Sequence, residues 1–334
     1  MNASLSTADA LRGALAGLLD GLPPTRAAQA VDRLIASYRG TTPTDAPVLR
    51  DRSDVVAYAA YRMPATFEAV RSALTALRGA APRWTPATHT DIGGGTGAAS
   101  WAVAEAWEDD GEGAAPRTTV LDWAEPALAL GRELADASGI ASLRAAGWQR
   151  SRISASLRIE NSDLVTVSYV LKELTEEDRA AVVTEAARAG QAVVIVEPGT
   201  PDGYQRIIDA RDRLVAAGLG IAAPCPHSGA CPIEPGTDWC HFAARVSRSS
   251  LHRQVKGGSL AYEDEKFSYV VATRFPVAPA SARVTRKPQL RKGQVLLELC
   301  TEDEGLRRDT VTKRHGALYK AARDAEWGDS WPPR

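Results

Sequence analysis

The chain has 334 residues, of which 44% are hydrophobic and 24% are charged, and its formal net charge is −1. These values are typical of an ordinary soluble globular protein, and the length predicts two or three lobes rather than one core. No apolar stretch approaches the roughly 18 residues of a membrane span. The first residues lack the basic head and apolar block of a secretory signal, so we expect no membrane partner and a cytoplasmic location.

Residues 1–85 form a predicted N-terminal helical region. Apolar residues recur at three- and four-residue spacing in Ala8–Leu19, Arg26–Tyr38 and Thr66–Leu77, which is the period of an amphipathic helix. Prolines and glycines separate these segments, and Pro64 is expected to mark such a break. The aromatic residues around Arg62 are interpreted as helix core, and an RNA-facing Arg62 stays open as an alternative.

Residues 86–224, together with about 262–275, alternate between strand and helix patterns. The predicted strands are His89–Ile92, Thr118–Asp122, Asp163–Tyr169, Ala192–Glu197 and a late strand, Lys266–Thr273. The predicted helices between them are Ala98–Trp107, Glu125–Ala137 and Glu176–Ala189. This alternation favours a doubly wound, mostly parallel α/β sheet.

A glycine-rich loop lies where the first strand meets the first helix, at Gly93-Gly-Gly95-Thr-Gly97. Such glycines allow close backbone approach, and the helix N-terminus offers unpaired N–H groups to a ligand. The spacing would also fit a dinucleotide site. Asp91 before the loop, Asp122 after the next strand and Asp163 at the start of a later one favour S-adenosylmethionine. We therefore predict cofactor contacts at Asp91, Gly93, Gly95, Gly97, Asp122 and, at the pocket mouth, Tyr169.

The methyl-acceptor side carries less information. The Asn/Asp-Pro-Pro-aromatic motif of base-amine methylases is missing, since the matching place reads Ser168-Tyr169-Val170-Leu171. Cytosine C5 methylation needs a cysteine nucleophile, and the sequence has no cysteine before Cys225. Methyl transfer depends mostly on positioning, so the catalytic residues and the enzyme status stay undetermined from sequence.

Three of the four cysteines, Cys225, Cys231 and Cys240, fall within sixteen residues of a Pro- and Gly-containing segment, and Cys300 ends an apolar run. A soft metal centre needs several thiolates converging on one point. Structural disulfides suit small secreted chains, and unrelated core thiols would not be expected to cluster in a loop. The pattern therefore indicates a metal or iron–sulfur site in a cysteine-rich module of residues 225–261 and 276–334.

The net charge is unevenly distributed along the chain. Between His241 and Lys292 there are eleven Lys and Arg against three acids, an excess of 11 − 3 = +8. A solvated charged face would explain this excess, but an anionic partner such as nucleic acid phosphate is favoured. We expect the RNA-facing surface to include Arg245, Arg248, Arg253, Lys256, Arg283, Arg286, Lys287, Arg291 and Lys292.

Taken together, these segments resemble a known family. The sequence resembles a bacterial member of the mitochondrial small-ribosomal-subunit methyltransferase-like family, the methyltransferase-like protein seventeen type. The resemblance covers nearly the whole chain and is carried by Tyr61–Thr66, Asp91–Gly97, Ser168–Leu174, Val196–Pro201, Cys225–His227, Cys231–Pro232, Trp239–Phe242 and Cys300.

The resemblance implies a class I (Rossmann-like) methyltransferase fold with an N-terminal helical region and a C-terminal cysteine-rich metal module. It also implies a [4Fe–4S] cluster on Cys225, Cys231, Cys240 and Cys300, with zinc as the alternative because four thiolates also satisfy tetrahedral zinc. The implied partner is the small ribosomal subunit or its rRNA during assembly. Two functions stay open: an S-adenosylmethionine-dependent rRNA methyltransferase, and a non-catalytic iron–sulfur assembly factor with a relic methyltransferase fold.

Overall fold

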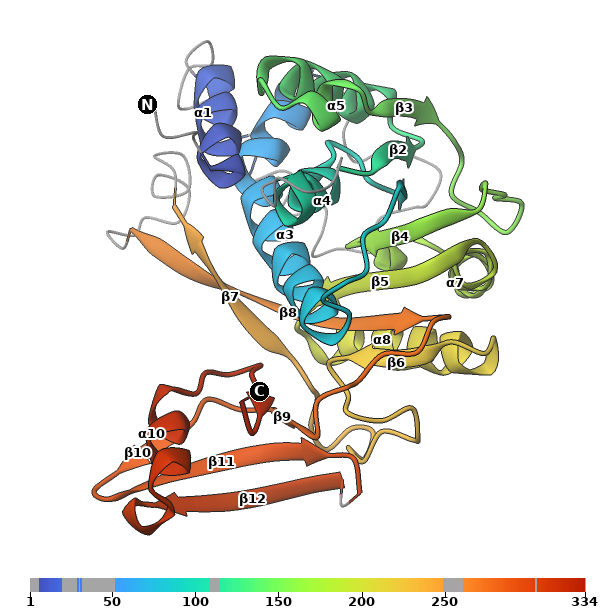
Figure 1. Ribbon diagram of the computed structural model, residues 1–334. Helices are drawn as coiled ribbons and strands as arrows, with labels where there is room; N and C mark the ends of the chain where they lie inside the picture. The colour runs from blue at the N-terminus through green and yellow to red at the C-terminus, as the bar shows by residue number, and fades with distance from the viewer. Residues whose placement is uncertain are drawn as a thin grey trace.

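The computed structural model describes residues 6–19, 29, 31, 52–108, 115–248, 261–303 and 305–333. Within these residues the chain forms an α/β lobe on an eight-stranded sheet and a C-terminal lobe on a five-stranded sheet (Figure 1). The helices are α1 (Thr7–Leu19), α3 (Arg52–Ala80), α4 (Ala98–Glu108), α5 (Glu125–Ala137), α6 (Ala141–Arg144), η1 (Leu171–Glu173), α7 (Glu176–Ala189), α8 (Pro201–Ala216), η2 (Lys313–His315) and α10 (Ala317–Asp324).

The large sheet has the strand order β3-β2-β1-β4-β5-β8-β6, and β7 pairs with β8 outside that path. Its strands are β1 (Thr88–Ile92), β2 (Arg117–Asp122), β3 (Gly147–Arg150), β4 (Ser162–Ser168), β5 (Gly190–Pro198), β6 (Gly220–Ala223), β7 (Phe242–Ser247) and β8 (Tyr262–Thr273). Strands β1 to β5 are parallel, whereas β8 runs antiparallel to β5 and β6. The predicted doubly wound sheet is confirmed, and the late strand does return to it.

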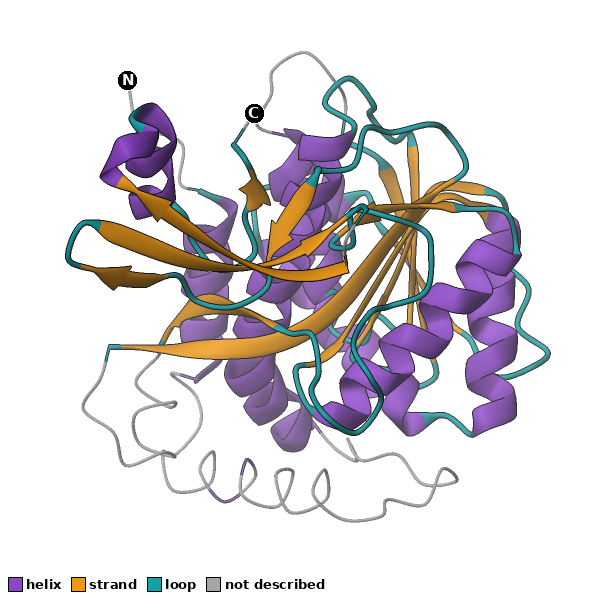
Figure 2. Cartoon of the chain, turned by 90° about the horizontal axis from the view of Figure 1, so that it is seen from below, coloured by secondary structure: helices purple, strands orange, loops and turns teal. Residues whose placement is uncertain are grey.

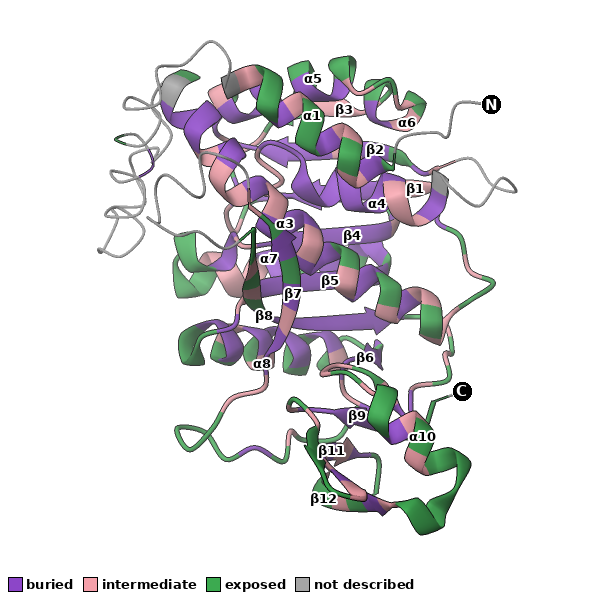
Figure 3. Ribbon diagram, turned by 90° about the vertical axis from the view of Figure 1, so that its left-hand side faces the viewer, coloured by how far each residue is buried: buried purple, intermediate pink, exposed green. Residues whose placement is uncertain are grey.

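Helices cover both faces of this sheet (Figure 2). Alternate residues of β5 explain how, because Val194 and Val196 join the core under α3 and α4 while Val193 and Ile195 join the core under α7 and α8. Side chains alternate between the faces of a strand, so a central strand that is covered twice must be apolar throughout. The central strands are accordingly buried along their length (Figure 3).

Helix α3 departs from the prediction, because it continues through Pro64 instead of breaking there. A proline inside a helix removes one hydrogen bond and costs about 3 kcal/mol or more. Its neighbours Met63, Ala65 and Phe67 are at most 2% exposed, so tertiary packing outweighs that local cost. Of the helix predicted over 26–38, only residues 29 and 31 lie among the described residues.

The C-terminal lobe is an antiparallel sheet with the order β10-β11-β9-β13, and β12 pairs with β11. Its strands are β9 (Ala282–Val284), β10 (Gln289–Arg291), β11 (Gln294–Thr301), β12 (Gly305–Thr312) and β13 (Ser330–Trp331). Val284, Leu297 and Leu299 belong to its core, which is separate from the two cores of the large sheet. The sequence analysis did not predict this sheet. Among the described helices, none is long and apolar enough to cross a membrane.

Candidate cofactor and cysteine sites

The glycine loop follows β1 at the carboxyl edge of the large sheet, and α4 begins directly after it. Gly93, Gly95 and Gly97 all have positive φ angles of 68°, 53° and 83°, a region that favours glycine. A Cβ at Gly97 would collide with the Trp148 ring, whereas a Cβ at Gly95 would meet only Asp122, at 3.7 Å. Gly95 therefore lies on the open side of the loop.

Asp91 lies beneath this loop and is fully buried. Its Oδ1 accepts a hydrogen bond from the Thr166 hydroxyl at 2.7 Å, and its Oδ2 has no partner among the described residues. A Cβ at Gly94 would collide with this carboxylate and with Val120. Burial raises the pKa of Asp91 to about 7, against the Thr166 bond, which lowers it. Asp91 thus supports the loop from below.

Because the pKa of Asp91 is raised, the unfolding free energy is expected to depend on pH. Because the folded pKa of about 7 exceeds the ordinary 3.8, the stabilisation from the bound proton is full below pH 3.8 and is lost as the pH rises through 7. Asp91→Asn does not titrate. The unfolding free energy of the variant minus that of the wild type should therefore rise by roughly 1.4 kcal/mol per pH unit across this window. Urea unfolding from pH 4.5 to 8 measures this difference, and a constant difference would contradict it.

Asp122 ends β2 and joins two loops at the same edge. Its Oδ2 accepts from the Gly95 N–H at 2.9 Å, and its Oδ1 accepts from the Ala124 N–H at 2.8 Å. Burial raises the pKa of Asp122, and these backbone bonds oppose that rise. The fold thus brings Asp122 against the glycine loop, and its bond to a ribose stays a prediction.

Asp163 lies at the start of β4, as the sequence predicted, and this places it away from the glycine loop. Its Oδ2 accepts from the Ala87 and Thr88 N–H groups at 2.9 and 3.0 Å. These residues precede or begin β1, at the opposite end of the strand from the glycine loop. Asp163 therefore joins β4 to β1 at the amino edge of the sheet and does not approach the predicted cofactor contacts.

Tyr169 follows β4 at the carboxyl edge and adopts a positive φ of 59°, which is uncommon for a residue other than glycine. Its hydroxyl donates to Glu265 Oε1 at 3.1 Å. Arg62 donates to both Glu265 oxygens, at 2.9 and 3.4 Å, and its guanidinium lies 5.6 Å from the Tyr169 ring centroid. Arg62 is therefore an ion-pair residue that joins α3 to β8 and β4.

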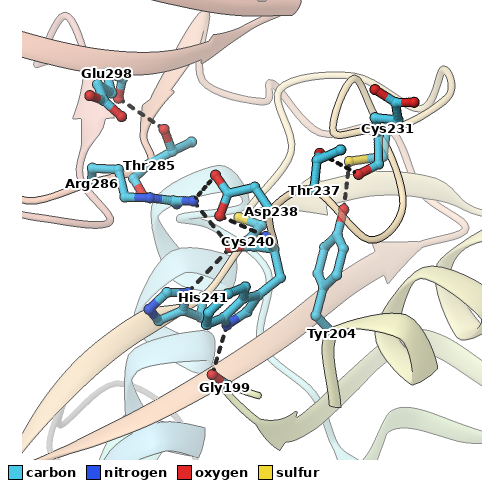
Figure 4. A network of polar contacts seen from close by, with 12 residues as sticks. Gly199, Tyr204, Cys231, Thr237, Asp238, Cys240, His241, Thr285, Arg286 and Glu298 are labelled. Carbon is cyan, nitrogen blue, oxygen red and sulfur yellow. Dashed lines mark hydrogen bonds and ion pairs between the residues drawn. The ribbon is translucent and has the colours of Figure 1, made fainter. Parts of the chain in front are cut away.

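The segment Glu197–Gly203 connects β5 to α8 and is shaped by close contacts. Glu197 is fully buried and pairs with Arg206 at 2.6 Å. A Cβ at Gly203 would collide with the Pro198 carbonyl, and one at Gly199 would collide with the backbone of β8. The Gly199 carbonyl accepts from Trp239 Nε1 at 2.9 Å (Figure 4). This segment thus joins the edge of the large sheet to the cysteine region.

All four cysteines line one cavity between the large sheet and the C-terminal sheet, and none forms a disulfide. Cys225 and Cys231 lie in the loop after β6, Cys240 precedes β7, and Cys300 lies on β11. The Cys231 thiol contacts the Tyr204 hydroxyl at 3.1 Å (Figure 4), and Cys300 lies 3.8 Å from His227 Nε2. The fold therefore brings together residues that the sequence separates by up to 75 positions, 300 − 225 = 75.

Burial raises the pKa values of three of these thiols. The pKa of Cys300 rises to about 12, that of Cys240 rises well above its usual range, and that of Cys225 also rises. For Cys240, burial is the main cause, and Cys225, Cys231 and Cys300 add to it. The raised pKa values mean that Cys225, Cys240 and Cys300 hold their protons when no metal is bound.

The side chains around the cavity decide which kind of metal centre the site could hold. Among the described residues, no group of three or more His, Cys, Asp or Glu side chains could hold a single metal ion. The four cysteines nevertheless share one cavity, into which only thiols among these donor types project. Four thiols are the ligands that both a [4Fe–4S] cluster and a tetrahedral zinc ion use. The residues present are compatible with an iron–sulfur cluster.

The structure changes which basic residues can form an RNA-facing surface. Arg283 is only 6% exposed and donates to the carbonyls of Pro224 and Gly328, so its placement on an RNA-facing surface was wrong. Arg245, Arg248 and Arg286 pair with Asp264, Glu263 and Asp238, respectively. Arg253 and Lys256 lie outside the described residues.

The turns at one end of the C-terminal sheet, on the left in Figure 1, carry exposed cations, of which Arg291 and Lys292 belong to the predicted surface and Lys313 and Arg314 do not. The Lys313 N–H donates to the Gly293 carbonyl at 3.2 Å, which places the β10–β11 turn beside the turn after β12. Within the described chain, no acid pairs with the exposed basic side chains of these turns. We call Arg291, Lys292, Lys313 and Arg314 the basic turns.

The strand order of the large sheet, with antiparallel β8 between β5 and β6 and a glycine loop after β1, defines the class I methyltransferase fold. The chain belongs to the Rsm22 family, described as mitochondrial small ribosomal subunit Rsm22, which matches residues 52–332. The family resemblance seen in the sequence is confirmed.

Two relatives show the extent of the similarity. The chain is 30% identical over 295 residues to the Homo sapiens protein named ribosome assembly protein METTL17, mitochondrial, covering 82% of this chain and 62% of that protein. It is 27% identical over 185 residues to Rsm22-cox11 tandem protein 2, mitochondrial, of Schizosaccharomyces pombe, covering 43% of this chain and 25% of that protein. The chain thus spans less than two thirds of the length of either relative.

Solved structures are more distant. Magnesium protoporphyrin IX methyltransferase from Synechocystis PCC 6803 with bound SAH has a TM-score of 0.41 and 14% identity, covering 63% of this chain and 84% of that one. A putative RNA methyltransferase from Pyrococcus horikoshii has a TM-score of 0.38 and 12% identity, covering 73% of this chain and 96% of that one. The fold assignment rests on the strand order.

Proposed function

We propose that this protein is an S-adenosylmethionine-binding, methyltransferase-like factor that binds small-subunit rRNA during ribosome assembly. The observation that carries the proposal is the extent of the family match, because residues 52–332 include the glycine loop, both acids beside it and all four cysteines. The human relative is named as a ribosome assembly protein, which supports the same role here.

S-adenosylmethionine binding is supported by the carboxyl edge of the large sheet. Open α/β sheets bind ligands at this edge, and Gly95 lies on the open side of the loop, where a ligand can approach the backbone closely. Gly93 and Gly97 instead make room for the side chains of Val170 and Trp148. Asp122 contacts Gly95, so a ligand over the loop would meet this carboxylate at once. Its two oxygens would accept hydrogen bonds from two ribose hydroxyls.

Calorimetry tests this site. Asp122→Ala removes the proposed ribose acceptor and should weaken S-adenosylmethionine binding by about ten- to a hundredfold, since two hydrogen bonds contribute about 1–3 kcal/mol. Gly95→Arg should abolish binding, because the side chain enters the open side of the loop. Asp163→Asn is the matched control: it alters a carboxylate at the opposite edge and should leave affinity unchanged. Tight NADH binding without S-adenosylmethionine or S-adenosylhomocysteine binding would contradict the assignment.

Two functions compete for this fold: methyl transfer to rRNA, and a non-catalytic role in ribosome assembly. A non-catalytic factor is favoured by the ion-pair network at the carboxyl edge, where both Glu265 oxygens and the Tyr169 hydroxyl are already used within the network. An intact glycine loop favours the enzyme. Mass spectrometry of small-subunit rRNA from a deletion strain separates the two, because only the enzyme predicts the loss of a methylated nucleotide.

We also propose that Cys225, Cys231, Cys240 and Cys300 hold one [4Fe–4S] cluster. Support comes from the cavity that the four cysteines share and from their free thiols. With four thiolate ligands and no open position, the cluster would supply a structural link rather than a reaction site. It would join the α/β lobe, which carries three of the ligands, to the C-terminal sheet, which carries Cys300.

The rRNA contact is proposed at the basic turns. Their cations are exposed and have no acidic partner among the described residues, in contrast to Arg245, Arg286 and Arg308, which each pair with an acid. Unpaired Lys and Arg side chains release counterions when they meet phosphates, and paired ones are already partly neutralised. The basic turns are therefore the part of the C-terminal lobe best suited to phosphate.

A further inference from the structure

Two buried arginines line the cysteine cavity together with the four thiols. Arg211 on α8 is 2% exposed, and Arg283 on β9 is 6% exposed. A buried guanidinium is costly unless an anion compensates its charge. Within the described residues Arg283 has no carboxylate partner, and the partner of Arg211, Asp212 at 3.1 Å, has a side chain that is 63% exposed.

Both arginines hold the backbone segments that carry the cysteines. Arg211 donates to the carbonyls of His227 (3.1 Å) and Gly229, which lie between Cys225 and Cys231. Its Nε is buried without a partner among the described residues. The peptide carbonyls satisfy hydrogen bonds, but they carry no net charge. These contacts therefore leave the positive charge of Arg211 without a buried counter-ion.

Arg283 lies next to cysteine-bearing segments of both lobes. It is the cross-strand partner of Cys300 in the β9–β11 pair, and directly opposed residues of an antiparallel pair project to the same face. Its Nε donates at 2.9 Å to the carbonyl of Pro224, the residue before Cys225. Arg283 thus contacts the chain beside one cysteine and lies opposite another, one from each lobe.

We propose that Arg211 and Arg283 are the counter-charges of an anionic cysteine-bound centre in this cavity. This inference rests on the proposed cluster. Four thiolates around a [4Fe–4S]²⁺ core leave two net negative charges, which two guanidinium groups balance. The same two groups stabilise the reduced centre most, because reduction adds a further negative charge in a site of low dielectric constant. The arginines therefore raise the affinity of the site for its centre and its reduction potential.

The full-length chain, reconstituted anaerobically with ferrous iron and sulfide, tests this role. Arg211→Gln and Arg283→Gln keep an amide donor for the carbonyls but remove the charge. We expect each substitution to lower the amount of bound iron. Each should also lower the melting temperature of the reconstituted protein more than that of the metal-free protein. Redox titration followed by electron paramagnetic resonance should show a more negative midpoint potential. Arg211→Lys and Arg283→Lys keep the positive charge, so they should partly restore the bound iron and the midpoint potential.

Arg206→Gln is the matched control, since Arg206 is a second arginine of α8 that pairs with buried Glu197 and does not line the cavity. It should lower the melting temperature equally in both states and leave the potential unchanged. If the Gln variants at 211 and 283 behave like this control, the arginines only hold carbonyls and the inference is overturned while the cluster stands. If the wild type takes up zinc and no iron, the proposed cluster fails. The zinc-loaded and metal-free melting temperatures then test the arginines, because tetrathiolate zinc carries the same two negative charges.

Discussion

Replacing Cys240 by serine is expected to lower the iron content of anaerobically purified protein from about four atoms per chain to less than one, and to remove its brown colour. Cys240 lines the same cavity as the other three cysteines, so it is one of the four proposed ligands. A cluster that loses one of its four thiolate ligands is bound less tightly and is expected to be released. Iron analysis and visible absorption measure the loss directly.

The same variant should loosen one lobe more than the other. Three ligands belong to the α/β lobe and one to the C-terminal sheet, so loss of the cluster removes a cross-link between lobes that each have a separate core. Limited proteolysis should therefore cut within residues 281–333 first. His241→Asn is the control: His241 stacks on Trp239 with ring centroids 5.3 Å apart and does not line the cavity, so iron should be retained. Colourless wild-type protein with one tightly bound zinc would contradict the cluster.

The α/β lobe was largely predictable because its signals are local. The helix predicted over Glu125–Ala137 and that over Glu176–Ala189 have the observed bounds, since apolar spacing and capping residues act within a few turns. Thr175, for example, caps α7 by accepting from the Asp178 N–H. The glycine loop was equally visible, because positive φ angles at Gly93, Gly95 and Gly97 demand glycine.

The C-terminal lobe and the networks around the sites were not predictable from local patterns. Strand β10 is exposed throughout. Strand β11 alternates buried and half-buried residues, but Leu296 makes Val295–Leu297 an unbroken apolar run, so the sequence hides that alternation. Glu265 meets Tyr169 across 96 positions of sequence and Arg62 across 203. The sequence shows that Arg283 is charged, but it does not show that Arg283 lies opposite Cys300. For that reason Arg283 was misassigned to the surface. A count of charges cannot show which cations folding buries or pairs.

Reversing the basic turns by the changes Arg291→Glu, Lys292→Glu, Lys313→Glu and Arg314→Glu is expected to weaken binding of small-subunit rRNA by a hundredfold or more at physiological salt. Each phosphate contact contributes about one unit to the slope of log affinity against log salt. Losing up to four contacts should therefore flatten that slope by about four units. The affinity for S-adenosylmethionine should stay unchanged, since the glycine loop belongs to the other lobe. Filter binding across a salt series, with calorimetry on the same protein, measures both.

The matched control reverses four other exposed arginines, Arg83, Arg117, Arg144 and Arg213. It changes the net charge equally and leaves the basic turns intact. If rRNA binding falls only in the first variant, position and not total charge decides the affinity, as phosphate-backbone contacts require. If both variants lose rRNA binding equally, the effect comes from the overall charge of the protein. If the variant of the basic turns still co-sediments with small subunits at the wild-type level, these turns are a solvated face. The contact would then have to be sought on another surface, because Arg248 and Arg286 are already paired and Arg283 is buried.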